Sequence, residues 1–246
     1  MKRKHLPKYE SLAYLVKGLT HGKSLDAQAR RGSYWRNTIK VCVKDGLGSG
    51  LLLSRDGYFV TNYHVLTEDK AWEGCQIMVP EISYKFPVSR ILAKSKLHDL
   101  VLAQASLSNV SVPTEVVFSN NLPCLTDRVR TYGYKSEIVE EKKGSLCFSD
   151  PFIQNMWGFL RVYGVNPELK NKARLNTIYS TCDVEEGWSG GPVVLENTGE
   201  LIGLSKMKVY TANPLTWAKL IPDKYHGFTS VRKLKEMIDY FLDKPE

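Results

Sequence analysis

The sequence predicts an all-β protein that ends in an α-helix. Short apolar runs recur along most of the 246-residue chain, and Gly, Asp, Asn and Ser residues that are typical of turns separate them. The last stretch instead repeats its apolar residues with the helical period of about 3.6. A chain of this length buries roughly three-quarters of its unfolded surface, which is enough for a substantial core.

The strand-like runs form two groups of six. The first group is Ile39–Val43, Leu51–Ser54, Tyr58–Asn62, Ile77–Val79, Arg90–Ala93 and Leu100–Ala103. The second group lies near 128–133, 144–148, 159–163, 176–180, 192–195 and 201–206. The mixed-charge run 137–143 is interpreted as a solvated hairpin arm.

The two ends of the chain differ from this pattern. Ser230 is suited to cap a C-terminal helix over 230–242, whose apolar residues are Val231, Leu234, Met237, Ile238, Phe241 and Leu242. Residues 1–36 are expected to form a partly helical extension, which either packs on the surface or covers the active cleft. Its apolar run 12–16 is too short for a signal or membrane segment, which predicts a cytoplasmic protein without a membrane partner.

Three motifs carry the chemistry. Ser189 stands in Gly-Trp-Ser-Gly-Gly-Pro, where flanking glycines expose its hydroxyl and let its N–H and that of Gly187 converge on an oxyanion hole. A serine nucleophile needs a general base, and His64 follows a strand-like run upstream. Asp99, at the start of a later strand, is the candidate that orients His64. The neighbouring His98 is a rival imidazole, but it is expected to point away from the Asp99 side chain.

These motifs resemble those of trypsin-like serine peptidases, in particular the HtrA/DegP-type branch. Residues 48–65 are similar to its first-barrel signature, in which a Gly-Ser-Gly strand, an Asp-Gly turn and a Thr-Asn-x-His-Val segment follow one another. Residues 98–102 resemble its Asp-Leu-Ala-Val-Leu segment, and residues 187–192 its Gly-Asn-Ser-Gly-Gly-Pro. The likeness covers roughly 38–242, is loose over about 105–175, and includes no PDZ domain.

The resemblance implies two six-stranded antiparallel β-barrels of the chymotrypsin type with the C-terminal helix. The protease domain would span 37–246, with barrels at about 37–110 and 120–229 and the active cleft between them. It implies a serine endopeptidase that hydrolyses protein or peptide substrates.

The residue roles follow from that chemistry. Ser189 attacks the peptide carbonyl, His64 transfers the proton, Asp99 fixes the imidazole, and the N–H groups of Gly187 and Ser189 bind the oxyanion. The alternative is a catalytically silent module of the same fold that binds proteins or acts like a chaperone, and a minor alternative is an esterase.

Trp188 departs from the family pattern. Secreted trypsins have at this position an Asp that pairs with a new N-terminus, so this chain is expected to lack that activation mechanism. HtrA-type enzymes usually have Asn. The indole is expected to pack under the oxyanion loop or to lie near the leaving-group side of the substrate.

The expected specificity residues lie on both sides of the nucleophile. Asp183 precedes Ser189 by six residues, an offset that in trypsin places a carboxylate in the pocket for Lys or Arg, although a plain loop residue is the alternative. Glu186 adds negative charge beside the site. An extended substrate is expected to pair with the strand edge at Leu204, Ser205 and Lys206.

Composition limits the other partners. The net charge of +8 accompanies no nucleic-acid-binding motif, so weak nonspecific attraction is the most that it predicts. The five cysteines show no metal-ligand spacing, and neither a metal nor an organic cofactor is expected. Their odd number also favours a reducing compartment, and homo-oligomer formation stays open.

Overall fold

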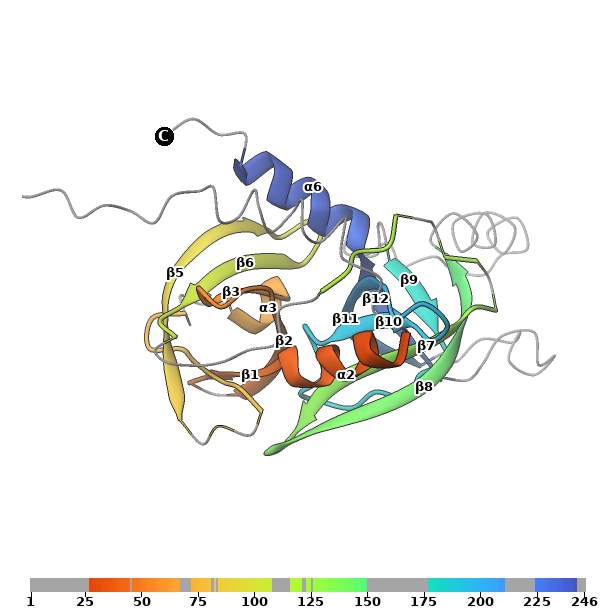
Figure 1. Ribbon diagram of the computed structural model, residues 1–246, viewed down its shortest axis with the longest axis horizontal. Coiled ribbons are helices and arrows are strands. Elements are labelled where there is room, and N and C mark those ends of the chain that lie inside the picture. Colours follow the sequence, from red (N-terminus) through yellow and green to blue (C-terminus); the bar gives the residue numbers. More distant parts are fainter. Residues whose placement is uncertain are drawn as a thin grey trace, which may run out of the picture.

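Two closed antiparallel barrels lie side by side in the computed structural model (Figure 1). The structure describes residues 27–44, 46–66, 72–80, 82, 84–107, 116–120, 123–124, 126–149, 177–210 and 224–242. The first barrel contains β1 (Thr38–Val43), β2 (Gly46–Leu52), β3 (Tyr58–Thr61), β4 (Gln76–Met78), β5 (Lys85–Ser95) and β6 (Leu100–Ala105). The second contains β7 (Arg128–Lys135), β8 (Ile138–Ser149), β9 (Thr177–Ser180), β10 (Pro192–Leu195), β11 (Leu201–Tyr210) and β12 (Lys224–Ser230).

Both barrels use the same strand order. The first runs β1-β2-β3-β6-β5-β4 and closes where β1 pairs with β4. The second, followed from β7, runs β7-β8-β9-β12-β11-β10 and closes where β10 pairs with β7. The fold class predicted from the sequence is confirmed.

One strand was not predicted from the sequence. The second barrel includes β12, whose sequence Lys-Tyr-His-Gly-Phe-Thr-Ser alternates poorly because it buries a histidine and a glycine. The predicted strand near 159–163 lies outside the described residues. The run 137–143 falls mostly within β8, which pairs with β7 along the β7–β8 hairpin.

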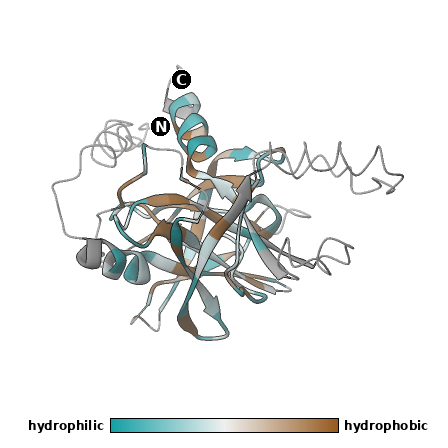
Figure 2. Cartoon of the chain, turned by 90° about the vertical axis from the view of Figure 1, so that its right-hand side faces the viewer, coloured by the Kyte–Doolittle hydropathy of each residue, from teal (hydrophilic) through white to brown (hydrophobic). Residues whose placement is uncertain are grey.

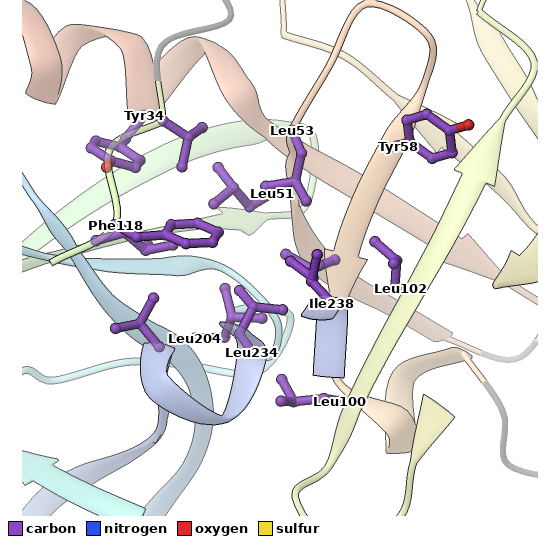
Figure 3. Packing of buried hydrophobic residues seen from close by; sticks show 14 of the residues in the cluster. Tyr34, Leu51, Leu53, Tyr58, Leu100, Leu102, Phe118, Leu204, Leu234 and Ile238 are labelled. Atoms are coloured by element: carbon purple, nitrogen blue, oxygen red, sulfur yellow. The ribbon is translucent and has the colours of Figure 1, made fainter. Parts of the chain in front are cut away.

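Helix α6 (Val231–Leu242) packs against both barrels, on β5 and on β11. Its buried residues Val231, Leu234 and Ile238 recur at helical spacing and therefore form one apolar face. This face joins the core cluster between the barrels, which also contains Leu102 from the first barrel and Leu204 from the second (Figure 3). Figure 2 shows hydrophilic residues on the opposite side of the helix.

Helix α2 (Ala27–Asn37) contributes to the same core. Tyr34 is fully buried, and its hydroxyl donates to the carbonyl of Val117 (2.9 Å) and accepts from the N–H of Val117 (3.1 Å). This part of the N-terminal region is therefore integral to the packing, because it fixes the segment that links the barrels. Residues 1–26 lie outside the described residues. No described helix has the length and hydropathy that a membrane-spanning helix requires.

We expect Tyr34→Phe to lower the free energy of unfolding by about 1–3 kcal/mol, because the buried Val117 N–H loses the Tyr34 hydroxyl as its partner, and the Val117 carbonyl keeps only the bond from the Leu201 N–H (2.7 Å). Urea unfolding measures the change. Tyr84→Phe, at a side chain that is 64% exposed, is the control and should change the free energy by less than about 0.5 kcal/mol. Equal effects of the two substitutions would contradict the role of the Tyr34 hydroxyl.

Candidate active site

His64 and Asp99 meet at the edge of the first barrel. Helix α3 (Tyr63–Leu66) begins just after β3, and Asp99 directly precedes β6, the strand that pairs with β3. His64 Nδ1 lies 2.8 Å from Asp99 Oδ2 and 3.1 Å from Oδ1. The backbone N–H of His64 donates to Oδ1 at 3.0 Å, so the carboxylate holds both the ring and the chain of His64.

The backbone around Asp99 is specialised for this contact. Its φ of 55° lies in the left-handed region, which Asp tolerates better than most residues. The side-chain amide of Asn62 donates to the Asp99 carbonyl at 2.9 Å and supports this conformation. Burial and the positive charge of Lys233 lower the pKa of the neighbouring His98.

The turn around Ser189 requires glycine. Gly187 has a φ of 92° and Gly190 a φ of 91°, in the region that residues with a side chain rarely adopt. A Cβ atom on Gly187 would also come within 2.6 Å of both Leu47 Cδ1 and the carbonyl oxygen of Tyr134. The turn can therefore approach the first barrel closely only because these positions lack side chains.

Ser49 of β2 fixes this turn to the first barrel. Its N–H donates to the carbonyl of Ser189 at 2.7 Å, and its hydroxyl donates to the carbonyl of Gly187 at 2.7 Å. The same hydroxyl accepts from the N–H of Tyr134 (2.8 Å), and the Ser49 carbonyl accepts from the Thr61 hydroxyl (2.6 Å). Three buried strands, β2, β3 and β7, thereby hold the serine turn next to the end of β3, where His64 follows.

Two N–H groups of the turn are available. Within the part of the chain that the structure describes, the amides of Gly187 and Ser189 donate no hydrogen bond. The amide of Trp188, between them, donates to the carbonyl of Glu185 at 3.3 Å. Unpaired N–H groups in a rigid turn suit an anionic oxygen.

The Ser189 hydroxyl donates to the carbonyl of Lys206 at 3.3 Å. Lys206 stands at an irregularity in β11, where the register against β12 shifts between Ser205 and Met207. Such bulges redirect a backbone group, here toward the serine. Among the described residues, no hydrogen bond joins Ser189 to His64; in unliganded enzymes such contacts often tighten only when substrate binds.

The predicted substrate edge is only partly open. Leu204 pairs with Pro192 on one side and with Thr229 on the other. The backbone N–H of Ser205 donates to the carbonyl of Gly191 at 2.7 Å, and the Ser205 carbonyl accepts from the N–H of Gly190 at 2.8 Å. The backbone groups of Leu204 and Ser205 are therefore engaged within the second barrel.

The acidic residues before Ser189 lie at the surface. Cys182 and Val184 are buried in the core of the second barrel, whereas Asp183 between them is exposed. Glu186 is also exposed. The structure therefore brings together His64 and Asp99, and Ser189 with Gly187, but leaves the carboxylates of Asp183 and Glu186 on the solvent side.

Trp188 packs under the turn, which is the first of its two expected arrangements. Its side chain is fully buried in the core of the second barrel. A Cβ atom on Gly133 of β7 would lie 2.6 Å from its ring, so a glycine is needed opposite the indole. The Trp188 indole therefore supports the serine turn by packing in the core of the second barrel.

Two residues near the site were not identified from the sequence. Ser49 was visible only as part of a Gly-Ser-Gly run. His226 stands in none of the three motifs; it is fully buried, Ser205 Oγ lies 2.7 Å from its Nε2, and burial lowers its pKa to about 3. Among the described residues, no group of three or more His, Cys, Asp or Glu side chains could hold a metal ion.

Known proteins share sequence and fold with this chain. The family described as the trypsin-like peptidase domain matches residues 48–204. The serine endoprotease DegS of Haemophilus influenzae is 23% identical over 175 residues, which cover 70% of this chain and 44% of DegS. The chain thus spans less than half the length of that relative.

Solved structures show the same fold. A serine endoprotease from Yersinia pestis has a TM-score of 0.63 at 16% identity, over 89% of this chain and 68% of that one. The Rv3671c protease of M. tuberculosis in an inactive form has a TM-score of 0.60 at 14% identity, over 86% of this chain and 92% of that one.

We expect Ser49→Ala to loosen the serine turn, because the Gly187 carbonyl and the Tyr134 N–H both lose their partner. Amide hydrogen exchange across 187–191 should become faster, and the free energy of unfolding should fall by about 1–3 kcal/mol. Ser54→Ala is the control, since its hydroxyl accepts only a local bond from the Tyr58 N–H. If both variants left exchange across 187–191 unchanged, the anchoring role of Ser49 would be refuted.

Proposed function

Because the chain belongs to the trypsin-like peptidase family, we propose that it is a serine endopeptidase in which Ser189 is the nucleophile, His64 the general base and Asp99 the residue that orients the base. The observation that carries the proposal is the contact between the barrels. The first barrel supplies a histidine held by a carboxylate, and the second supplies a serine turn with two unpaired N–H groups, locked to the first by Ser49.

The proton path follows from the His64 ring. Its Nδ1 is hydrogen-bonded to Asp99, so Nε2 is the nitrogen that takes the Ser189 proton. The imidazolium then delivers this proton to the leaving amine, while the Asp99 carboxylate stabilises the positive charge. Water attacks the acyl-enzyme with the same base and releases the acid product.

The oxyanion of each tetrahedral step would bind the N–H groups of Gly187 and Ser189. One such donor contributes about 3 kcal/mol to transition-state stabilisation in related enzymes. Because the Ser49 contacts fix the carbonyls on this turn, the donors are in place before the negative charge develops.

Lys206 couples substrate binding to the nucleophile. Its carbonyl accepts the Ser189 hydroxyl, and the same carbonyl would be an acceptor for an extended substrate on β11. A substrate N–H that takes this carbonyl would release the hydroxyl toward His64. Binding of a peptide backbone would thereby prepare the attacking group.

We expect the substrate to be a protein or peptide chain, and we expect no specific nucleic-acid or membrane partner. The cysteine pattern supports a cytoplasmic location, and self-association is left to measurement.

A fluorophosphonate probe tests the nucleophile directly. We expect rapid labelling of the wild-type protein at Ser189, mapped by mass spectrometry, and no labelling of Ser189→Ala or His64→Ala. His98→Ala is the matched control: it removes the neighbouring imidazole and should still label. A wild-type protein that does not label would favour the catalytically silent module of the same fold.

Replacement of Asp99 by Asn should reduce kcat by roughly 10³–10⁴-fold with little change in KM, because an amide favours the wrong imidazole tautomer and does not stabilise the imidazolium. Steady-state kinetics on a cleaved peptide measure the loss, and circular dichroism checks the fold. A loss smaller than tenfold would show that Asp99 does not orient the base.

A further inference from the structure

Residues 185–188 form a β-turn that carries one of the two proposed oxyanion donors. The N–H of Trp188 donates to the carbonyl of Glu185 at 3.3 Å, which closes the turn. Gly187, the third residue, has a φ of 92°, whereas Glu186, the second, does not have a positive φ. A positive φ at the third position alone is the mark of a type II turn, which favours glycine there. The chain therefore enters the serine turn through a type II β-turn.

The turn type decides where the Gly187 N–H points. Between type I and type II turns, ψ of the second residue changes by about 150° and φ of the third by about 170°, so the middle peptide is turned over. Here the middle peptide joins Glu186 to Gly187, and its N–H is the proposed donor. A type I turn would place the Glu186 carbonyl where this N–H now points. Contacts that stabilise the type II form therefore keep the donor in place.

The two ends of this turn are held differently. Trp188 is fully buried, so packing holds its end. At the other end, Glu185 Oε2 lies 2.7 Å from the Nζ of Lys135, the last residue of β7, and the two side chains are 38% and 49% exposed. The hydrogen bond from Lys135 lowers the pKa of Glu185, and the same contact raises the pKa of Lys135. An ion pair thus ties the first residue of the turn to β7.

The end of β7 is itself fixed beside the turn. The Tyr134 N–H donates to the Ser49 hydroxyl at 2.8 Å, and a Cβ atom on Gly187 would lie 2.6 Å from the Tyr134 carbonyl oxygen. Just beyond Lys135, Glu137 lies 2.6 Å from the Nζ of Lys40 on β1, and the Lys40 side chain is only 9% exposed. Lys135 therefore meets Glu185 from a segment that the first barrel holds in position.

We propose that Lys135 and Glu185 are positioning residues for the oxyanion site, because their ion pair holds the turn 185–188 in the form that presents the Gly187 N–H to the developing negative charge. Both act through the backbone of the turn and not on the substrate. The inference rests on the proposed peptidase function and names two residues that support its oxyanion site. An exposed ion pair contributes modestly, so the effect on rate is a few-fold one.

A double-mutant cycle tests the pair. We expect Lys135→Met and Glu185→Gln each to lower kcat by about two- to fivefold with little change in KM, since the oxyanion forms only in the transition state. The double variant should lose no more than either single variant, because each substitution removes the same interaction. End-point titration with the fluorophosphonate normalises every rate to the fraction of working Ser189.

Ionic strength gives a second measurement. The ratio of wild-type kcat to Lys135→Met kcat should fall toward one as NaCl rises from about 0.05 to 1 M, because salt screens an exposed pair. A loss caused by poor folding or by the missing Lys135 methylene groups would not respond to salt in this way. Arg232→Met is the matched control: it breaks an exposed ion pair with Glu236 on α6 and should leave kcat unchanged.

The outcomes separate the two proposals. Single variants with wild-type kcat, losses that add in the double variant, or a ratio that does not change with salt would each overturn the positioning role and leave the peptidase proposal intact. A raised KM with unchanged kcat would also overturn it, since the pair would then act in substrate binding. A wild-type protein that neither labels nor cleaves overturns both proposals.

Discussion

The arrangement of the site depends on how closely β2 approaches the serine turn. Ser49 uses its N–H and hydroxyl to hold two carbonyls of that turn, and the space around these bonds is too small for side chains. A Cβ atom on Gly190 would lie 2.1 Å from the Ser49 carbonyl oxygen, and one on Gly48 would lie 2.5 Å from Val65. Glycines on both sides of this approach therefore stand where a side chain would not fit.

The turn is supported from below by packing. Trp188 fills the interior of the second barrel, where the secreted enzymes that the motifs resemble use an aspartate paired with a new N-terminus. An indole buried among aliphatic and aromatic side chains holds the turn without an ion pair. In the first barrel, the left-handed backbone conformation of Asp99 lets its carboxylate accept hydrogen bonds from both the ring and the backbone N–H of His64.

Most of the fold was predictable from sequence, and so was the contact between His64 and Asp99. The motifs around His64, Asp99 and Ser189 each occupy short local segments, so the sequence identifies these residues as candidates, and their catalytic roles stay predictions. The strand β12, the anchoring role of Ser49 and the burial of His226 were not predictable, because each depends on contacts between distant segments. Asp183 is exposed because its neighbours Cys182 and Val184 are buried in the core of the second barrel. The six-residue spacing between Asp183 and Ser189 does not reveal this burial.

The distance along the chain between the two anchoring groups has a consequence for biosynthesis. Ser49 and Gly187 are 138 residues apart, so the turn is locked only after both barrels have closed. Contacts of such long range form late in folding. The residues of the first barrel precede Ser189 in the chain, so the proposed base and the proposed nucleophile come together only after the second barrel has been made.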